Sequence, residues 1–133
     1  NQELKDWDVS NVTKMYGLFM EAKVFNQELN NWDVSKVTDM YRMFKDAKKF
    51  NKPLNKWNTG NVEDMSYMFD AAEEFDQELK DWDTAKATTM RGMFQTASNY
   101  KNHDLSGWDV TLVTNHQAFH FGTGGGNTEP KWK

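Results

Sequence analysis

Residues 26–50 read NQELNNWDVSKVTDMYRMFKDAKKF, and this 25-residue unit recurs along most of the chain. Full copies occupy residues 1–25, 26–50, 51–75 and 76–100, and a degenerate fifth copy occupies residues 101–121. A fixed period of this length predicts structural units that stack in a line and bury a common core between neighbours. Residues 122–133 break the pattern with several glycines, and we expect them to form a linker or tail.

The composition narrows the classes of partner and site. The chain has 133 residues, a net charge of -4 and 27% charged residues, which disfavours a nucleic-acid partner. Because it contains no cysteine, disulfides and thiolate metal sites are excluded. No apolar run approaches the ~20 residues of a membrane helix, so we expect no membrane insertion in this fragment. Any export signal or anchor is expected to lie outside it.

Two apolar patterns recur in every repeat. The first joins a leucine to a tryptophan three residues later, and its members are Leu4, Trp7, Leu29, Trp32, Leu54, Trp57, Leu79, Trp82, Leu105 and Trp108. The second includes Met40, Phe44, Met65 and Phe69, with spacings of three and four that favour a helix of two to three turns. Asp33 and Ser35 precede this stretch as expected helix caps. The polar stretch before each tryptophan is predicted to be a short strand.

The strings NQELNNWDVSKVTDMYRMFKDAKKF and NKPLNKWNTGNVEDMSYMF resemble the repeat of bacterial surface proteins related to BspA-type leucine-rich repeats. This family is common among mycoplasma lipoproteins and is also called the palindromic amphipathic repeat family. The resemblance spans about residues 1–120 and implies an exported or cell-surface protein without a catalytic motif. With the right-handed crossover rule, it predicts a leucine-rich-repeat-like α/β solenoid, with short parallel strands on one face and short helices on the other.

Two exposed columns are candidates for contact with a partner. The acidic column comprises Glu3, Glu28, Glu78 and Asp104, and stacked carboxylates at neighbouring rungs repel one another. Either nearby lysines neutralise them, or they form an acidic stripe for a basic partner or divalent cations. Tyrosines at Tyr16, Tyr41 and Tyr67 lie beside the apolar stripe, where they either cover the core or act as interface anchors.

The sequence gives weaker support to a calcium site, a histidine metal site and a sugar-binding surface. Asp6, Asp8 and Ser10 resemble the start of a calcium loop, but the required downstream glycine and acid are missing. His116 and His120 have metal-ligand spacing without a clear third ligand. The tryptophan column is interpreted as core rather than as a sugar-stacking platform. We therefore predict no metal and no cofactor.

These features predict a non-enzymatic surface module that binds a host or neighbouring-cell protein through its exposed strand face. Catalysis needs unlike groups that converge on one spot, whereas this chain spreads similar groups along a line. A carbohydrate-binding solenoid and a structural spacer are the alternatives. The open apolar end of the first repeat also predicts end-to-end self-association.

Overall fold

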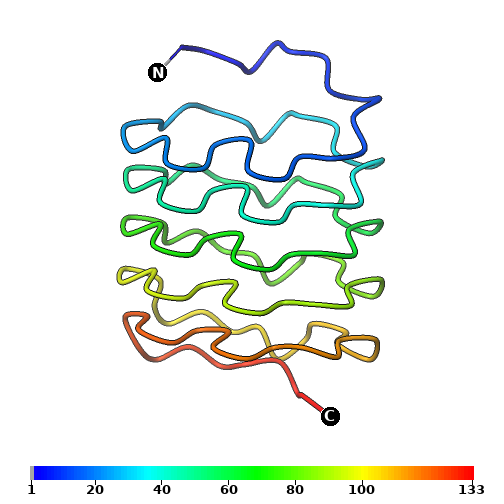
Figure 1. Cartoon of the computed structure of the whole chain (residues 1–133), viewed down its shortest axis with the longest axis vertical. Coiled ribbons are helices and arrows are strands. Elements are labelled where there is room, and N and C mark those ends of the chain that lie inside the picture. The colour runs from blue at the N-terminus through cyan, green and yellow to red at the C-terminus, as the bar shows by residue number, and fades with distance from the viewer. Residues whose placement is uncertain (1) are drawn as a thin grey trace.

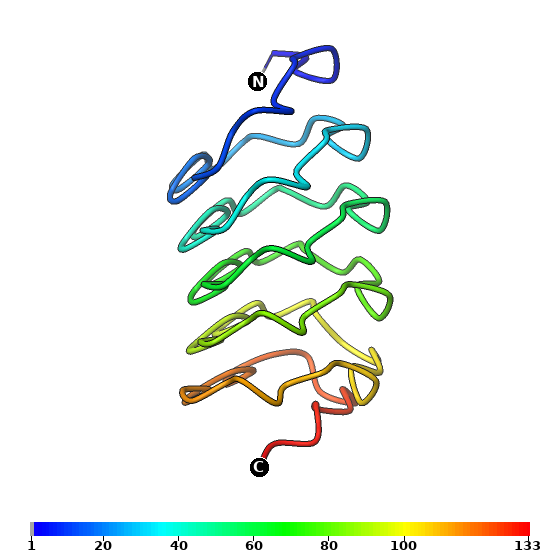
Figure 2. The same ribbon diagram turned by 90° about the vertical axis from the view of Figure 1, so that its right-hand side faces the viewer.

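The computed structural model describes residues 2–133 as a stack of similar coils (Figures 1 and 2). Each repeat forms one coil, and the coils follow one another from the N-terminal to the C-terminal end of the stack. We define coil 1 as residues 2–25, coil 2 as 26–50, coil 3 as 51–75, coil 4 as 76–100 and coil 5 as 101–121. Residues 122–133, red in Figure 1, form a C-terminal segment at the bottom of the stack.

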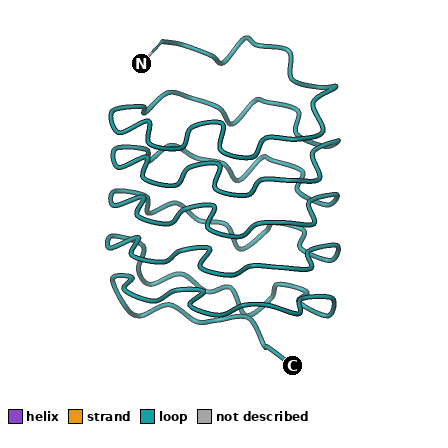
Figure 3. Ribbon diagram, viewed as in Figure 1, coloured by secondary structure: helices purple, strands orange, loops and turns teal. Residues whose placement is uncertain are grey.

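Helices and continuous strands are absent from residues 2–133 (Figure 3). The only β-type pairings there are isolated parallel bridges, which join Lys14 to Asp39, Asp39 to Asp64, Asp64 to Thr89, Thr89 to Asn115, Lys101 to Gly125 and Asp104 to Thr128. The predicted right-handed, leucine-rich-repeat-like α/β solenoid is therefore wrong. The predicted strand face and helix face are replaced by turns and short connecting segments.

Consecutive turns stand where a helix was expected. In coil 2, the N–H of Met43 donates to the carbonyl of Met40, and the N–H of Ala47 donates to the carbonyl of Phe44. These bonds span three residues, whereas a helix needs bonds that span four. The third residues of the two turns, Arg42 and Asp46, have φ values of 56° and 57°. A type II turn needs positive φ at that position, and a right-handed helix excludes it.

Alternate N–H groups along these turns bind the next coil. The amides of Met40, Arg42, Phe44 and Asp46 donate to the carbonyls of Asp64, Ser66, Met68 and Asp70, at 2.8–3.0 Å. The same four bonds recur at each junction from coil 1 to coil 5. Bonds elsewhere in the coil run the other way, from the N–H groups of Glu63 and Asp64 to the carbonyl of Thr38 and from the N–H of Glu74 to the carbonyl of Lys48. Each coil therefore has a donor edge toward the C-terminal end and an acceptor edge toward the N-terminal end.

Aromatic rings stack along the axis inside the coils. Phe44 lies between Phe19 and Phe69, with ring centroids 5.4 and 5.5 Å apart. The indole N–H of Trp57 donates to the carbonyl of Leu29 in the preceding coil, at 2.8 Å. Twelve predicted core residues are at most 4% exposed: Leu29, Trp32, Leu54, Trp57, Leu79, Trp82, Leu105, Trp108, Met40, Phe44, Met65 and Phe69.

Coil 1 departs from the predicted core. Trp7 is 61% exposed, and Leu4 is only half-buried against the core. In the other coils, the corresponding tryptophan packs against the coil that precedes it. No described coil covers that side of coil 1, so Trp7 lacks the contact that buries its counterparts.

Ion pairs distinguish the junction between coils 2 and 3. They join Lys45 to Asp70, Lys48 to Glu73 at 2.7 Å, and Lys49 to Glu74 at 2.5 Å. The hydrogen bond that Lys48 donates to Glu73 raises the pKa of its ammonium group, and the pKa of Lys49 is raised in the same way by Glu74. The same columns hold uncharged residues in coil 4: Gln95, Ser98 and Asn99.

The C-terminal segment, expected to be a linker or tail, pairs with coil 5 and with the last residue of coil 4. The N–H of Leu105 donates to the carbonyl of Thr128 at 2.9 Å, and the N–H of Gly124 donates to the carbonyl of Tyr100 at 3.0 Å. The ring of Trp132 stacks on His116, with centroids 4.1 Å apart. Asn127 continues the amide column of the repeats, so the segment resembles the start of another coil.

Truncation of a central core ring should be far more costly than truncation at the open end. We expect Trp57→Ala to lower the free energy of unfolding by about 3–5 kcal/mol, because the large cavity cannot collapse between two coils. Trp7→Ala is the matched control, with an expected loss of about 1 kcal/mol or less. Urea unfolding followed by circular dichroism measures both, and equal losses would contradict the core assignment.

Tyr100 offers a stabilising substitution. Its ring stacks on Phe94 and Phe75, but its hydroxyl is buried and has no hydrogen-bond partner among the described residues. Burial raises the pKa of this hydroxyl above the ordinary value of a tyrosine. Phenylalanine occupies the same column in the preceding repeats. We expect Tyr100→Phe to raise the free energy of unfolding by roughly 1 kcal/mol; a loss in a urea titration would indicate a missed hydrogen bond.

Candidate interaction surfaces

Part of the acidic column is neutralised by lysines. Glu28 lies 3.5 Å from the ammonium group of Lys52, which comes from the next coil. Glu3 lies 3.9 Å from Lys5 of its own coil. Exposed pairs of this kind contribute little to stability, but they reduce the negative field that a basic partner would meet.

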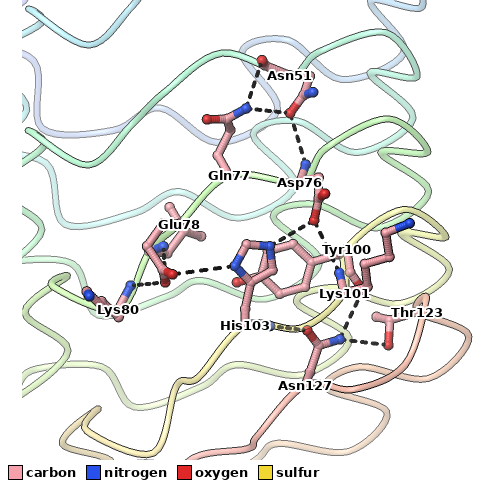
Figure 4. Close-up of polar contacts among 11 residues, drawn as sticks. Asn51, Asp76, Gln77, Glu78, Lys80, Tyr100, Lys101, His103, Thr123 and Asn127 are labelled. Atoms are coloured by element: carbon pink, nitrogen blue, oxygen red, sulfur yellow. Dashed lines mark hydrogen bonds and ion pairs between the residues drawn. The ribbon is translucent and has the colours of Figure 1, made fainter.

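Glu78 belongs to a polar cluster around His103 (Figure 4). Nε2 of His103 lies 2.8 Å from an oxygen of Asp76, and Nδ1 lies 3.7 Å from an oxygen of Glu78. The imidazole stacks on the ring of Tyr100 at 4.2 Å, and its side chain is 11% exposed. Glu78 also accepts a hydrogen bond from the N–H of Lys80. Its carboxylate is therefore engaged within the fold.

His103 was missed as a candidate, although the sequence carries a signal for it. Its column holds glutamine in three other repeats, at Gln2, Gln27 and Gln77. In coil 4, Gln77 donates to the side-chain oxygen of Asn51 at 2.8 Å. The histidine instead reaches back to the two carboxylates of coil 4, which ties coil 5 to its neighbour.

Asp104 closes a local turn. Its carboxylate accepts a hydrogen bond from the N–H of Ser106 at 3.0 Å. Hydrogen bonding by the Ser106 side chain and amide lowers the pKa of Asp104. Asp33 and Ser35 form the same kind of turn, at 3.0 Å, so these residues cap a turn rather than the predicted helix. The four acids of the column therefore do not form one unpaired stripe.

A second surface combines aromatic and guanidinium groups. We call it the Tyr–Arg surface, and it comprises Tyr16, Tyr41, Arg42, Tyr67 and Arg91. The guanidinium carbon of Arg42 lies 4.7 Å from the ring centre of Tyr41 and 5.7 Å from that of Tyr67. Arg91 lies 5.8 Å from the Tyr67 ring. Alternating cations and rings stabilise one another through cation–π attraction.

The turns hold these side chains in place. Tyr41 and Arg42 are the central residues of the turn from Met40 to Met43. Tyr67 has a φ of 56° in the column where coil 4 has Gly92. A Cβ atom at Gly92 would lie 2.6 Å from the ring of Tyr67. The ring of Tyr67 thus rests directly on the backbone of Gly92, and a side chain at position 92 would collide with it.

Beside this surface lies a hollow of about 210 Å³, lined by Tyr16, Gly17, Met20, Tyr41 and Arg42. Tyr16 is 65% exposed, and most of the lining is apolar. Nε of Arg42 is buried and has no hydrogen-bond partner among residues 2–133. The hollow suits an apolar side chain, and a guanidinium at its edge suits a carboxylate.

The remaining candidates are used within the fold. Asp8 accepts hydrogen bonds from the N–H and hydroxyl of Ser10, at 3.0 and 2.6 Å, which closes a turn. His120 lies 2.6 Å from a carboxylate oxygen of Glu129, and no group of three or more histidine or acidic residues within 2–133 is arranged to hold a metal ion. Four tryptophans of the column are buried, which leaves them unable to form a sugar-stacking platform.

A methyl group at Gly92 should disturb the Tyr–Arg surface. We expect Gly92→Ala to lower the free energy of unfolding by about 1–2 kcal/mol, because φ is 57° there and the Tyr67 ring must move. Gly107→Ala is the control, since a Cβ atom at that position would have no neighbour within 4 Å and its φ is not positive. Thermal unfolding of both variants tests this expectation, and equal melting temperatures would refute it.

The fold defines a repeat protein made of stacked 25-residue coils. The chain belongs to the family described as "Mycoplasma protein of unknown function, DUF285", which matches residues 1–108 and again 30–129. This match confirms the family resemblance found in the repeats. No curated protein and no solved structure matches the chain. None of the residues 2–133 forms a helix long and apolar enough to cross a lipid bilayer.

Proposed function

We propose that this chain is a non-enzymatic protein-interaction module that meets its partner through the Tyr–Arg surface. The observation that carries the proposal is the hollow between Tyr16 and Tyr41, bordered by a guanidinium that is already oriented by two rings. Tyrosine and arginine are the side chains most often found as anchors of protein interfaces. The acidic column is the weaker candidate, because local amides, lysines and His103 occupy its carboxylates.

The partner that suits this surface presents an apolar side chain for the hollow and a carboxylate for Arg42. Because Arg42 contacts the rings of Tyr41 and Tyr67, these three side chains lose little freedom on binding. Membership of a Mycoplasma repeat family supports a location at the bacterial surface, where the partner would be a protein of the host or of a neighbouring cell. Both the location and the partner are part of the proposal.

The repeats themselves supply substitutions that test the proposal. Arg42→Gly places the residue of coils 1 and 4 at this position, and Tyr41→Ser places the residue of coil 3. Both variants should fold normally, and Arg42→Gly also relieves the positive φ of a non-glycine residue. Against an array of host extracellular proteins and glycans, we expect each variant to weaken protein binding by about tenfold or more.

Glu28→Gln and Glu78→Gln serve as matched controls on the acidic column. Loss of binding in these controls, with Arg42→Gly unchanged, would move the contact to the acidic column and refute the proposed surface. Binding to glycans alone would refute the class of partner. The absence of any binding would favour a structural spacer.

A further inference from the structure

Both arginines of the chain, Arg42 and Arg91, belong to the Tyr–Arg surface. Neither forms an ion pair among residues 2–133, although the chain has 20 acidic side chains and a net charge of -4. The ion pairs of this range use lysine or histidine as the positive partner instead. The two guanidiniums therefore keep donors for an acidic group that comes from another molecule.

The acidic column that precedes these turns does not neutralise the arginines. The carboxylate of Asp39 accepts a hydrogen bond from the N–H of Tyr41 at 3.0 Å. Asp64 accepts one from the N–H of Ser66 at 2.7 Å. These carboxylates are used to close turns, as they are elsewhere in the coils. In coil 4 the same column holds Thr89, so the turn that follows lacks an acid at this position.

Tyr67 holds the two guanidiniums on neighbouring coils. The guanidinium carbon of Arg42, in coil 2, lies 5.7 Å from the ring centre, and that of Arg91, in coil 4, lies 5.8 Å from the same ring centre. The ring packs on the backbone of Gly92, and its edge-to-face partner Tyr41 lies 6.2 Å away. Hydrogen-bonded neighbouring chains are about 4.8 Å apart, so two coil steps separate the arginine backbones by roughly 10 Å.

Two of these side chains occupy a column that suits glycine. Arg42 and Tyr67 each have a φ of 56°, and coils 1 and 4 have Gly17 and Gly92 in the same column. A side chain in this left-handed conformation costs free energy that glycine avoids. Retention of a guanidinium and a ring at strained positions favours a role in binding over a role in the stability of the coil.

We infer that the partner of the Tyr–Arg surface presents two carboxylates, one for each guanidinium, on a segment that runs along the axis of the stack. This inference rests on the proposed function and adds a second acid to the contact with Arg42. A polyproline II segment with acids three residues apart has the required spacing, because one turn advances about 9 Å and returns to the same face. Such a segment crosses coils 2 to 4.

The arrangement selects the spacing of acids rather than net charge. A guanidinium is planar and donates paired hydrogen bonds to one carboxylate, and it is already oriented here by the tyrosine rings. A partner with one acid engages one guanidinium only. A partner whose two acids are adjacent in sequence directs them to different faces of an extended segment, so it also leaves one guanidinium unpaired.

Three peptides with acetylated and amidated ends test this inference. The first is Leu-Glu-Pro-Pro-Glu, in which the leucine serves the hollow beside Arg42. The second, Leu-Glu-Pro-Pro-Gln, has one acid, and the third, Leu-Glu-Glu-Pro-Pro, has two adjacent acids. Because the chain has only two arginines, the Nε–H signals of an isotopically labelled sample report each guanidinium separately in NMR titrations. We expect the first peptide to shift both signals and to bind about fivefold more tightly than the others, as one added ion pair allows.

Two variants show whether Arg91 supplies this advantage. Arg91→Gln places the residue of coil 5 at this position, Gln117, and should abolish the preference for the first peptide over the second. Lys56→Asn is the matched control, because it removes one positive charge from an exposed position of coil 3 and places the residue of coil 2 there. This variant should keep the whole preference. Unchanged circular dichroism establishes that both variants are folded.

Equal affinities for the first and second peptides, or a preference that persists in Arg91→Gln, would overturn the inference. Equal binding of the peptide with adjacent acids would also overturn it, since net charge would then account for the affinity. A first peptide that does not bind would do the same. The proposed function has its own outcome: a protein from the array whose binding is lost in Arg42→Gly but kept in Arg91→Gln would retain the Tyr–Arg surface and remove only the second carboxylate.

Discussion

The division of backbone hydrogen bonds within each coil is the constraint on which the rest of the structure depends. Alternate amides between Met40 and Ala47 close turns inside the coil, and those between them bind the next coil. Buried amides must find acceptors, so every coil has to repeat the same turns at the same columns. Coil 5 contains one inserted residue, Lys101. The backbone accommodates it next to Asn102, whose φ is 59°. The ladder resumes its register beyond that point, with Met90 paired to Asn115.

The repeat can be recognised from the sequence because the core positions recur in every coil. The buried tryptophans Trp32, Trp57, Trp82 and Trp108 are an example. The helix prediction failed because a spacing of three and four residues suits consecutive turns as well as a helix. The distinguishing signal is the positive-φ column, which holds Gly17 and Gly92 but also Arg42 and Tyr67. Arg42, Tyr67 and, in coil 5, Ala118 therefore hide the signal that the two glycines show, and reading the glycines as one column would have exposed it.

The candidate surfaces were harder to derive than the core. Tyr41 and Tyr67 could be selected from the sequence, but their arrangement around Arg42 depends on which turn holds each residue. For a related reason, the sequence left two interpretations of the acidic column open. Glu28 and Glu78 find partners that lie about 25 residues further along the chain, and only the stacking of coils brings them together. The secondary-structure propensity of a single repeat contains no information about which side chains of adjacent coils will meet.

The ion pairs between coils 2 and 3 favour these two coils as neighbours when the stack forms. Since all coils share one backbone pattern, a folding chain that skipped a coil would still form a ladder of similar bonds. Lys45 and Lys48 would then face Gln95 and Ser98 instead of Asp70 and Glu73, and both sets of charges would lose their counterparts. For the same reason, a duplicated repeat inserted at this junction would separate the charges, whereas insertion elsewhere would leave them together. The array can thus lengthen by duplication while one pair of coils is preserved as neighbours.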